Sequence, residues 1–242
     1  MNSPSKILLM LEATRSLIEY MQGAVLTIPL QNIAPKGDGH PVVIFPGLGT
    51  SDSSTQFLRN FLRDLGYEAY PWGLGRNMGP RHGLEKLTKD IEDRVRGIST
   101  QHGGAKVSLI GWSLGGIYAR EIAKIAPEIT RQVITLGSPF KGDLTSTNAT
   151  RLYELLSKDK SHLDPEIVAS IAKKPTVPFT SIYSKTDGVV SWEASLEDEG
   201  PLSENIEIPN ASHMGLSHNP YSMHIIADRL AQPESDWQKY KS

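Results

Sequence analysis

Short apolar runs and amphipathic stretches alternate along residues 41–136, and this alternation constrains the fold more than any other feature. The run Pro41–Phe45 is bounded by prolines and too short for a helix, so it predicts a buried strand. Repetition of this order predicts βαβ units and a parallel sheet, whose strands are buried on both faces. We expect strands at 41–46, 67–70, 106–110 and 132–136, with helices at 52–65, 83–100 and 114–126.

The alternation lapses after Pro139. Residues 140–175 are largely polar and offer two short helix candidates, at 148–158 and 164–173. Strands are expected again at 179–183 and 205–208, followed by a last helix at 221–230. We interpret residues 140–175 as a small helical cap or lid at the carboxyl edge of the sheet, inserted within a single domain spanning residues 1–242. The tail from Pro233 to Ser242 is expected to be loosely held.

A helix is also predicted near the N-terminus, from about residue 5 to residue 22. Its apolar residues recur at near-helical spacing: Leu8, Leu11, Leu17 with Ile18, and Met21. We expect this amphipathic helix to pack on the domain; the alternative is a membrane-surface or lid helix, although surface helices usually carry more Lys and Arg. The run Ile7–Leu11 is too short for a signal peptide and no run reaches a membrane span, so we expect a soluble, cytoplasmic protein.

The composition excludes several classes of function. Among the 242 residues, 25 Lys plus Arg against 27 Asp plus Glu give a formal net charge of −2, without the basic excess of a nucleic-acid-binding protein. There is no cysteine, which excludes disulfides, a thiolate nucleophile and metal sites with Cys ligands. With 38% hydrophobic residues, the chain can form a sizeable core.

The segment Gly111-Trp-Ser-Leu-Gly115 has the pattern G-x-S-x-G and lies between a predicted strand and a predicted helix. At such a junction a serine is held in a strained backbone conformation, with its hydroxyl projecting from the sheet edge. Small residues on either side let the strand and the helix approach closely. Ser113 is therefore the predicted nucleophile.

A serine hydroxyl becomes a good nucleophile only when a base removes its proton. His213 follows the strand predicted at 205–208 and is the predicted base, ahead of His218 and His224. Asp187 follows the strand predicted at 179–183 and is the predicted acid, because active-site residues of open α/β sheets gather at the carboxyl ends of strands. Asp143, after the preceding strand, is the alternative acid.

Two backbone N–H groups are needed to stabilise the negative oxygen that forms when an acyl carbon is attacked. Leu48 and Leu114 are the predicted donors: Leu114 follows the nucleophile, and Leu48 lies in the glycine-rich loop after the first strand. Large apolar residues beside the motifs predict an apolar substrate pocket, although such residues often belong to the core instead. The candidates are Trp112, Met78, Phe140, Trp192 and Met214.

Together these motifs resemble the α/β-hydrolase family, and within it the bacterial serine esterases and lipases. The resemblance covers about residues 40–231 and departs at Pro46-Gly47, where many of those lipases have His-Gly. It rests, in the family's order, on Pro46-Gly-Leu-Gly49, Gly111-Trp-Ser-Leu-Gly-Gly116, Gly137-Ser-Pro139, Ser184-Lys-Thr-Asp-Gly188 and Ser212-His213. It implies an α/β-hydrolase fold with a mostly parallel sheet, here of about six strands, flanked by helices.

The resemblance also implies a reaction. Ser113, His213 and Asp187 would hydrolyse a carboxylic ester through an acyl-enzyme, with no cofactor and no metal. The expected partner is a small-molecule or lipid ester; no nucleic acid and no stable membrane insertion are expected, while contact with a lipid interface stays open. The alternatives are an acyltransferase or thioesterase with the same residues, or a non-catalytic binding module. Neither the preferred acyl chain nor the oligomeric state is predicted.

Overall fold

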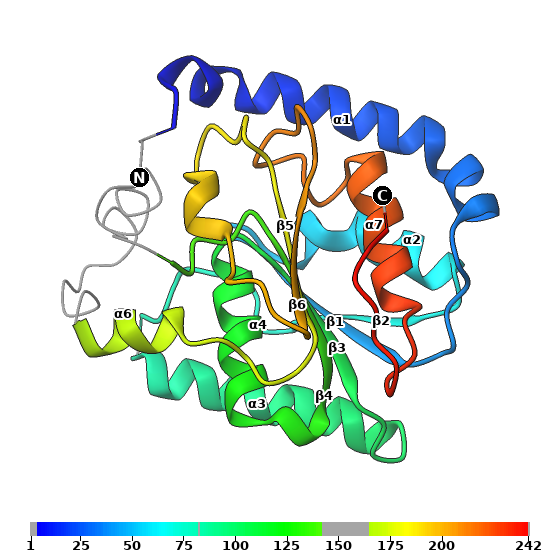
Figure 1. Cartoon of the computed structure of the whole chain (residues 1–242), viewed down its shortest axis with the longest axis vertical. Coiled ribbons are helices and arrows are strands. Elements are labelled where there is room, and N and C mark those ends of the chain that lie inside the picture. The colour runs from blue at the N-terminus through cyan, green and yellow to red at the C-terminus, as the bar shows by residue number, and fades with distance from the viewer. Residues whose placement is uncertain (1–3, 82, 142–164, 242) are drawn as a thin grey trace.

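The computed structural model describes residues 4–81, 83–141 and 165–241, and its centre is a parallel sheet (Figure 1). The strands lie in the order β2-β1-β3-β4-β5-β6, and each neighbouring pair is parallel. This confirms the predicted sheet of about six strands. The strands are β1 (Pro41–Phe45), β2 (Glu68–Pro71), β3 (Val107–Trp112), β4 (Thr130–Leu136), β5 (Phe179–Tyr183) and β6 (Ser203–Glu207).

The central strands are apolar along their length because they pack against helices on both faces. Every residue of β1 and β3 is buried. Successive side chains point to opposite faces of a strand, so Val43 and Ile44 enter different clusters. Residues that pair between neighbouring strands point to the same face of the sheet: Val43 pairs with Leu109, and Leu109 pairs with Val133. The sheet thus separates two hydrophobic cores.

The helices divide between the two faces. One core takes its helical side chains from α2 and α7, and the other takes them from α3 and α4. The predicted helices in these regions are confirmed, with ends that differ by a few residues. They are α2 (Gln56–Asp64, after the short η1, Asp52–Thr55), α3 (Leu84–Gln101), α4 (Leu114–Ile125, before η2, Pro127–Ile129) and α7 (Pro220–Leu230).

The predicted insertion lies mostly outside the described residues. The helix candidate at 148–158 is among the residues that are not described, while the candidate at 164–173 corresponds to α6 (Pro165–Ala172). The short η5 (Trp192–Ser195) follows β5. In the C-terminal tail, the prediction of a loosely held segment was wrong. Arg229 donates to the Gln238 carbonyl at 2.6 Å, and the Tyr240 N–H donates to Glu204 at 2.6 Å, so buried charged groups bind the tail.

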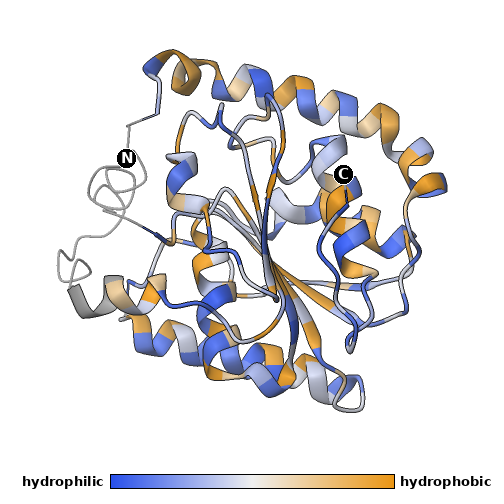
Figure 2. Cartoon of the chain, in the orientation of Figure 1, coloured by the Kyte–Doolittle hydropathy of each residue, from blue (hydrophilic) through white to orange (hydrophobic). Residues whose placement is uncertain are grey.

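The N-terminal helix α1 (Lys6–Ile33) is longer than predicted and runs along one side of the molecule (Figure 1). Its buried residues are Glu12, Ser16, Glu19 and Gly23. Most of the exposed large hydrophobic side chains among the described residues lie on this helix, and Figure 2 shows apolar residues along most of its length. The predicted packing of this helix on the domain is confirmed, but the packed face is the polar one. The reason is that α1 lies on loops whose backbone N–H groups need acceptors. Within the described ranges, no helix is both long and apolar enough to cross a membrane.

Candidate active site

Ser113 lies at the turn between β3 and α4 in a backbone conformation that few residues adopt. Its φ is 54° and its ψ is −124°, a positive-φ geometry that is strained for a side chain with a Cβ. The Ser113 N–H donates to the Leu136 carbonyl at 2.8 Å, which fixes the turn against the end of β4. The residue remains partly exposed. Strain of this kind often marks a functional residue.

The glycines beside Ser113 are required by close packing. A Cβ on Gly111 would lie 2.2 Å from Gly116 Cα, and a Cβ on Gly115 would lie 2.5 Å from the Phe45 carbonyl oxygen. Both positions are closer than real Cβ atoms approach backbone, so a larger residue would push α4 away from β1 and β3. The sharp turn at Ser113 depends on this contact.

The loops after β5 and β6 bring Asp187 and His213 together. His213 Nδ1 donates a hydrogen bond to Asp187 Oδ2 at 2.6 Å, and both residues are buried. Asp187 Oδ1 accepts bonds from the N–H groups of Val189 at 2.8 Å and Val190 at 2.7 Å. The carboxylate is therefore held by its own loop and directed at the imidazole. With Nδ1 engaged as a donor, Nε2 is the nitrogen that can accept a proton.

The surroundings of His213 favour its protonated form. Burial lowers the pKa of His213, but the charge of Asp187, the hydrogen bond to Asp187 and the charge of Glu12 raise it. The net result is a pKa above the ordinary histidine value. Such a histidine holds a proton well once it has taken one, as a general base must during a reaction.

Ser113 and His213 lie at the same edge of the sheet. The ring of Trp112, the residue before Ser113, is 6.0 Å from the His213 imidazole. A Cβ on Gly137 would lie 3.0 Å from His213 Nδ1 and 3.1 Å from Asp187 Oδ2, so β4 ends against the same pair. Within the described residues, no hydrogen bond joins Ser113 Oγ to His213. In ligand-free enzymes such bonds are often long and tighten when substrate binds.

The loop after β1 packs against the Ser113 turn. A Cβ on Gly47 would lie 3.0 Å from the Trp112 ring. Asn77 holds the loop from the other side, because its side chain donates to the Pro46 carbonyl at 2.8 Å and its carbonyl accepts from the Gly49 N–H at 2.6 Å. The loop is therefore fixed beside the serine.

The two predicted oxyanion donors lie on these touching segments. In the described part of the chain, the N–H of Leu48 makes no hydrogen bond. The N–H of Leu114 belongs to the first residue of α4, a position that has no acceptor within its helix. Neither N–H group is therefore taken up by an acceptor in the described part of the chain.

The predicted pocket residues have different surroundings, and Phe140 needs a correction. Phe140 is 1% exposed and belongs to the core: its ring meets the Phe179 ring at 5.5 Å, and the Arg120 guanidinium lies 3.8 Å from its centre. Trp192 stacks on Tyr183 at 5.8 Å. Apolar character predicts burial but does not tell a core position from a pocket wall.

Two of the remaining candidates flank the site and one lines a cavity. Trp112 packs beside His213, and Met214, the residue after that histidine, is exposed. Met78 lines a cavity of about 320 Å³ between the loop after β2 and the start of α3. The cavity is also lined by Trp72, Leu74, Arg76, Arg81 and Lys86, so its wall combines apolar groups with cations.

The rival site residues lie elsewhere or outside the described residues. Asp143, the alternative acid, is among the residues that are not described. His218 bonds through Nε2 to the Ser16 hydroxyl and carbonyl of α1, and His224 lies within α7. His40 lies in the loop before β1, buried between Asp38 and Ser108.

Sequence reasoning missed the polar side chains of α1 that reach the two loops of the site. Glu12, Arg15 and Glu19 all contact residues between positions 186 and 219. A signal was present in the sequence: these are the charged residues between Ile7 and Ile33, and their spacing puts them on one helical face. A helix whose charged side chains share one face can pack that face against polar groups of the domain.

Comparison with known proteins agrees with this arrangement. Residues 39–178, more than half of the chain, match a family described as serine aminopeptidase, S33. The chain belongs to this family of α/β-hydrolases. The match contains Ser113 and the loop after β1, and it ends before Asp187 and His213.

Two curated relatives are bacterial triacylglycerol lipases. The protein of Pseudarthrobacter phenanthrenivorans is 27% identical over 181 residues, which are 71% of this chain and 54% of that protein. The protein of Burkholderia plantarii is also 27% identical over 181 residues, covering 71% of this chain and 49% of that one. This S33 family member thus spans about half the length of the curated relatives it matches.

Solved structures agree on the fold. The mature lipase BlEst2 of Bacillus licheniformis superposes with a TM-score of 0.60 at 17% identity, over 82% of this chain and 94% of that one. At this identity the likeness shows the fold alone, and the predicted α/β-hydrolase architecture is confirmed.

Proposed function

We propose that this S33 family member is a serine hydrolase that cleaves carboxylic esters through Ser113, His213 and Asp187. The observation that carries the proposal is the buried 2.6 Å contact between His213 Nδ1 and Asp187 Oδ2, at the same sheet edge as a serine with φ of 54°. Ester hydrolysis is favoured because the two bacterial relatives are named triacylglycerol lipases. The proposal for the activity of this protein rests on the site geometry and on these relatives together.

The first half of the reaction forms an acyl-enzyme. Ser113 Oγ attacks the ester carbonyl carbon while His213 Nε2 takes the hydroxyl proton. Asp187 keeps Nδ1 protonated and stabilises the imidazolium. The N–H groups of Leu48 and Leu114 donate to the oxyanion, a contribution that typically changes the rate by about 10²–10³ for each donor. His213 then gives its proton to the leaving alcohol as the carbon–oxygen bond breaks.

The second half of the reaction returns the enzyme to its starting state. Water attacks the acyl carbon on Ser113 while His213 takes a proton from that water. Collapse of the second tetrahedral intermediate releases the carboxylic acid, and His213 returns the proton to Ser113 Oγ. None of these steps calls for a metal ion or cofactor. An alcohol or thiol in place of water would make the same residues an acyltransferase.

The test uses p-nitrophenyl esters from acetyl to palmitoyl, with Ser113→Ala as the matched variant. We expect the parent to release p-nitrophenol and the variant to fall to the background rate. The preferred chain length then separates a short-chain esterase from a lipase. Aminoacyl p-nitroanilides form a second arm, because the family is described as serine aminopeptidase.

Other outcomes of the same assay would contradict ester hydrolysis. Cleavage of the anilides without cleavage of any ester would assign the chain to amide hydrolysis. No cleavage, but labelling of Ser113 by a fluorophosphonate, would point to acyl transfer or a thioester substrate. Neither cleavage nor labelling would leave a binding module with a hydrolase fold.

A further inference from the structure

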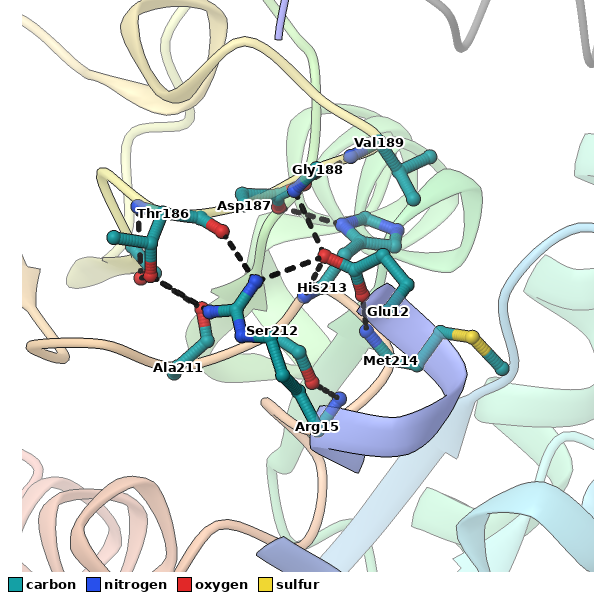
Figure 3. A network of polar contacts seen from close by, with 12 residues as sticks. Glu12, Arg15, Thr186, Asp187, Gly188, Val189, Ala211, Ser212, His213 and Met214 are labelled. Atoms are coloured by element: carbon teal, nitrogen blue, oxygen red, sulfur yellow. Dashed lines mark hydrogen bonds and ion pairs between the residues drawn. The ribbon is translucent and has the colours of Figure 1, made fainter. Parts of the chain in front are cut away.

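The loops that carry Asp187 and His213 are joined by a side chain from a distant part of the chain. Glu12 lies on α1 and is 3% exposed. Its Oε1 accepts hydrogen bonds from the N–H groups of Gly188 at 2.8 Å and His213 at 3.2 Å, and its Oε2 accepts one from Met214 at 3.1 Å (Figure 3). One carboxylate therefore bridges the residue after the acid and the base itself.

We propose that Glu12 is a positioning residue of the Ser113–His213–Asp187 site, which fixes the two loops relative to each other and sets the charge beside the imidazole. The inference rests on the proposed function and deepens it. It assigns a role to α1, which lies wholly outside the residues 39–178 that match the family. Glu12 acts through its neighbours, because its hydrogen-bond partners are the backbone N–H groups of Gly188, His213 and Met214.

Glycines at the contact show that α1 and the loops are fitted to each other. A Cβ on Gly188 would lie 2.5 Å from the Leu8 carbonyl carbon, so the backbone of α1 rests directly on the residue after the acid. A Cβ on Gly215 would lie 1.8 Å from Glu19 Oε2. A larger residue at Gly188 would force the helix backbone away, and a larger residue at Gly215 would displace the Glu19 carboxylate. Because these glycines have no side chain, the carboxylates of α1 can reach backbone N–H groups of the loops.

Arg15 makes a second bridge between the same loops. Its guanidinium donates to the Thr186 carbonyl at 2.8 Å and to the Asn210 carbonyl at 3.1 Å. It also lies 3.6 Å from Glu12 Oε1, so the two side chains form an ion pair one helical turn apart (Figure 3). Glu12 thus binds donors on the two loops and Arg15 binds acceptors on them. The paired charges suit a position that is largely closed to water.

Among the residues that the structure describes, Asp187 and Glu12 are the charged groups next to His213, and they lie on different elements. Asp187 approaches from the loop after β5, and Glu12 approaches from α1. Arg15 forms an ion pair with Glu12, and Glu19 accepts a hydrogen bond from the N–H of Ser212, the residue before His213. The negative charge of Glu12 stabilises the protonated imidazole, adding to the effect of Asp187. A side chain that only tied the loops together would leave the proton affinity of His213 unchanged.

The experiment compares Glu12→Gln, Glu12→Asp and Glu19→Gln in the full chain, using the pH profile of kcat/KM. The glutamine oxygen of Glu12→Gln can still accept from Gly188 and His213, but the charge is gone. We expect its acid limb to move to lower pH by about half a unit, because removing a negative charge lowers the pKa of His213. Glu12→Asp keeps the charge but shortens the reach. We expect its acid limb to stay in place while kcat/KM falls about 10-fold.

Glu19→Gln is the matched control. Glu19 lies on the same face of α1, is also buried, and accepts from the Ser212 N–H at 3.0 Å and the Asn219 amide at 3.0 Å. Within the described residues it makes no hydrogen bond to the Asp187 loop. We expect this variant to lower Tm, as the loss of buried acceptors should, without moving the acid limb.

An unmoved acid limb in folded Glu12→Gln, or an unchanged kcat/KM in Glu12→Asp, would overturn the proposal. If Glu12→Gln does not fold, Glu12→Asp alone decides the positioning role. The pKa of His213 is also measured by NMR titration in the parent and in Glu12→Gln. A lower pKa in the variant supports the charge effect even if no ester is hydrolysed, so failure of the proposed function and failure of this inference give different results.

Discussion

The indole Nε1 of Trp112 donates a hydrogen bond to the backbone carbonyl of His213 at 3.0 Å. Trp112 directly precedes Ser113 in the chain, so this bond joins the turn that carries the nucleophile to the loop that carries the base. Gly47, from the loop after β1, packs on the same indole. One side chain therefore contacts three segments that contribute to the site.

Trp112→Phe tests this connection. Phenylalanine keeps most of the apolar contact with Gly47 but removes the donor, so the His213 carbonyl loses its partner. We expect kcat/KM for a p-nitrophenyl ester to fall about 10-fold, because the loop of His213 is no longer fixed relative to the turn of Ser113. Fluorophosphonate labelling of Ser113 should slow by a similar factor. Unchanged values of both rates would show that the bond is only structural.

Asp187→Asn tests the assignment of the acid. An asparagine of the same size cannot stabilise the imidazolium and does not favour the Nδ1–H tautomer, so we expect kcat to fall about 10³–10⁴-fold. Steady-state hydrolysis and circular dichroism together separate this loss from unfolding. A variant that kept a tenth or more of the parent activity would contradict the assignment, and Asp143→Asn would then be the next variant to measure.

The pH dependence of the parent follows from the surroundings of His213. The histidine must be neutral to take the serine proton, and its pKa is raised, with Asp187 and Glu12 overcoming the effect of burial. We therefore expect kcat/KM to be lost as the pH falls, with a midpoint above about 6.5, the ordinary value for histidine. A midpoint well below that value would mean that burial dominates or that another group limits the rate.

A buried ion pair predicts a stability effect away from the site. Arg120 of α4 lies 2.8 Å from Glu197, and their side chains are 0% and 1% exposed. Glu197→Ala would leave a buried guanidinium charge without this partner, and we expect the free energy of unfolding in urea to drop by about 3–5 kcal/mol. Glu128→Gln removes an exposed partner of Arg96 and serves as the control. No measurable change is expected for that control, whereas equal effects would contradict the argument.

The sheet and the serine turn could be predicted because both depend on local patterns. A short apolar run such as Pro41–Phe45 must bury both faces of its strand, and a central strand between two layers of helices does so. The turn at Ser113 needs glycines at fixed positions, which the sequence displays. In both cases the determining residues are neighbours in the chain.

The orientation of α1 and the role of its side chains could not be predicted in the same way. The partners of Glu12 lie at positions 188, 213 and 214, so the contact exists only after the whole sheet has formed. Periodicity identified the helix but not the side that it buries, because an apolar face normally turns inward. Phe140 was misplaced for a related reason: proximity to a motif in sequence does not say on which side of the backbone a ring lies.

The central claim is that Ser113 forms a covalent acyl intermediate with the help of His213. The most direct measurement is mass spectrometry of protein mixed with a p-nitrophenyl ester and quenched in acid within a turnover. The account predicts an acyl adduct on the peptide that contains Ser113, absent from Ser113→Ala and formed more slowly in His213→Ala. Ester hydrolysis that proceeds without an adduct, and that survives Ser113→Ala, would contradict it.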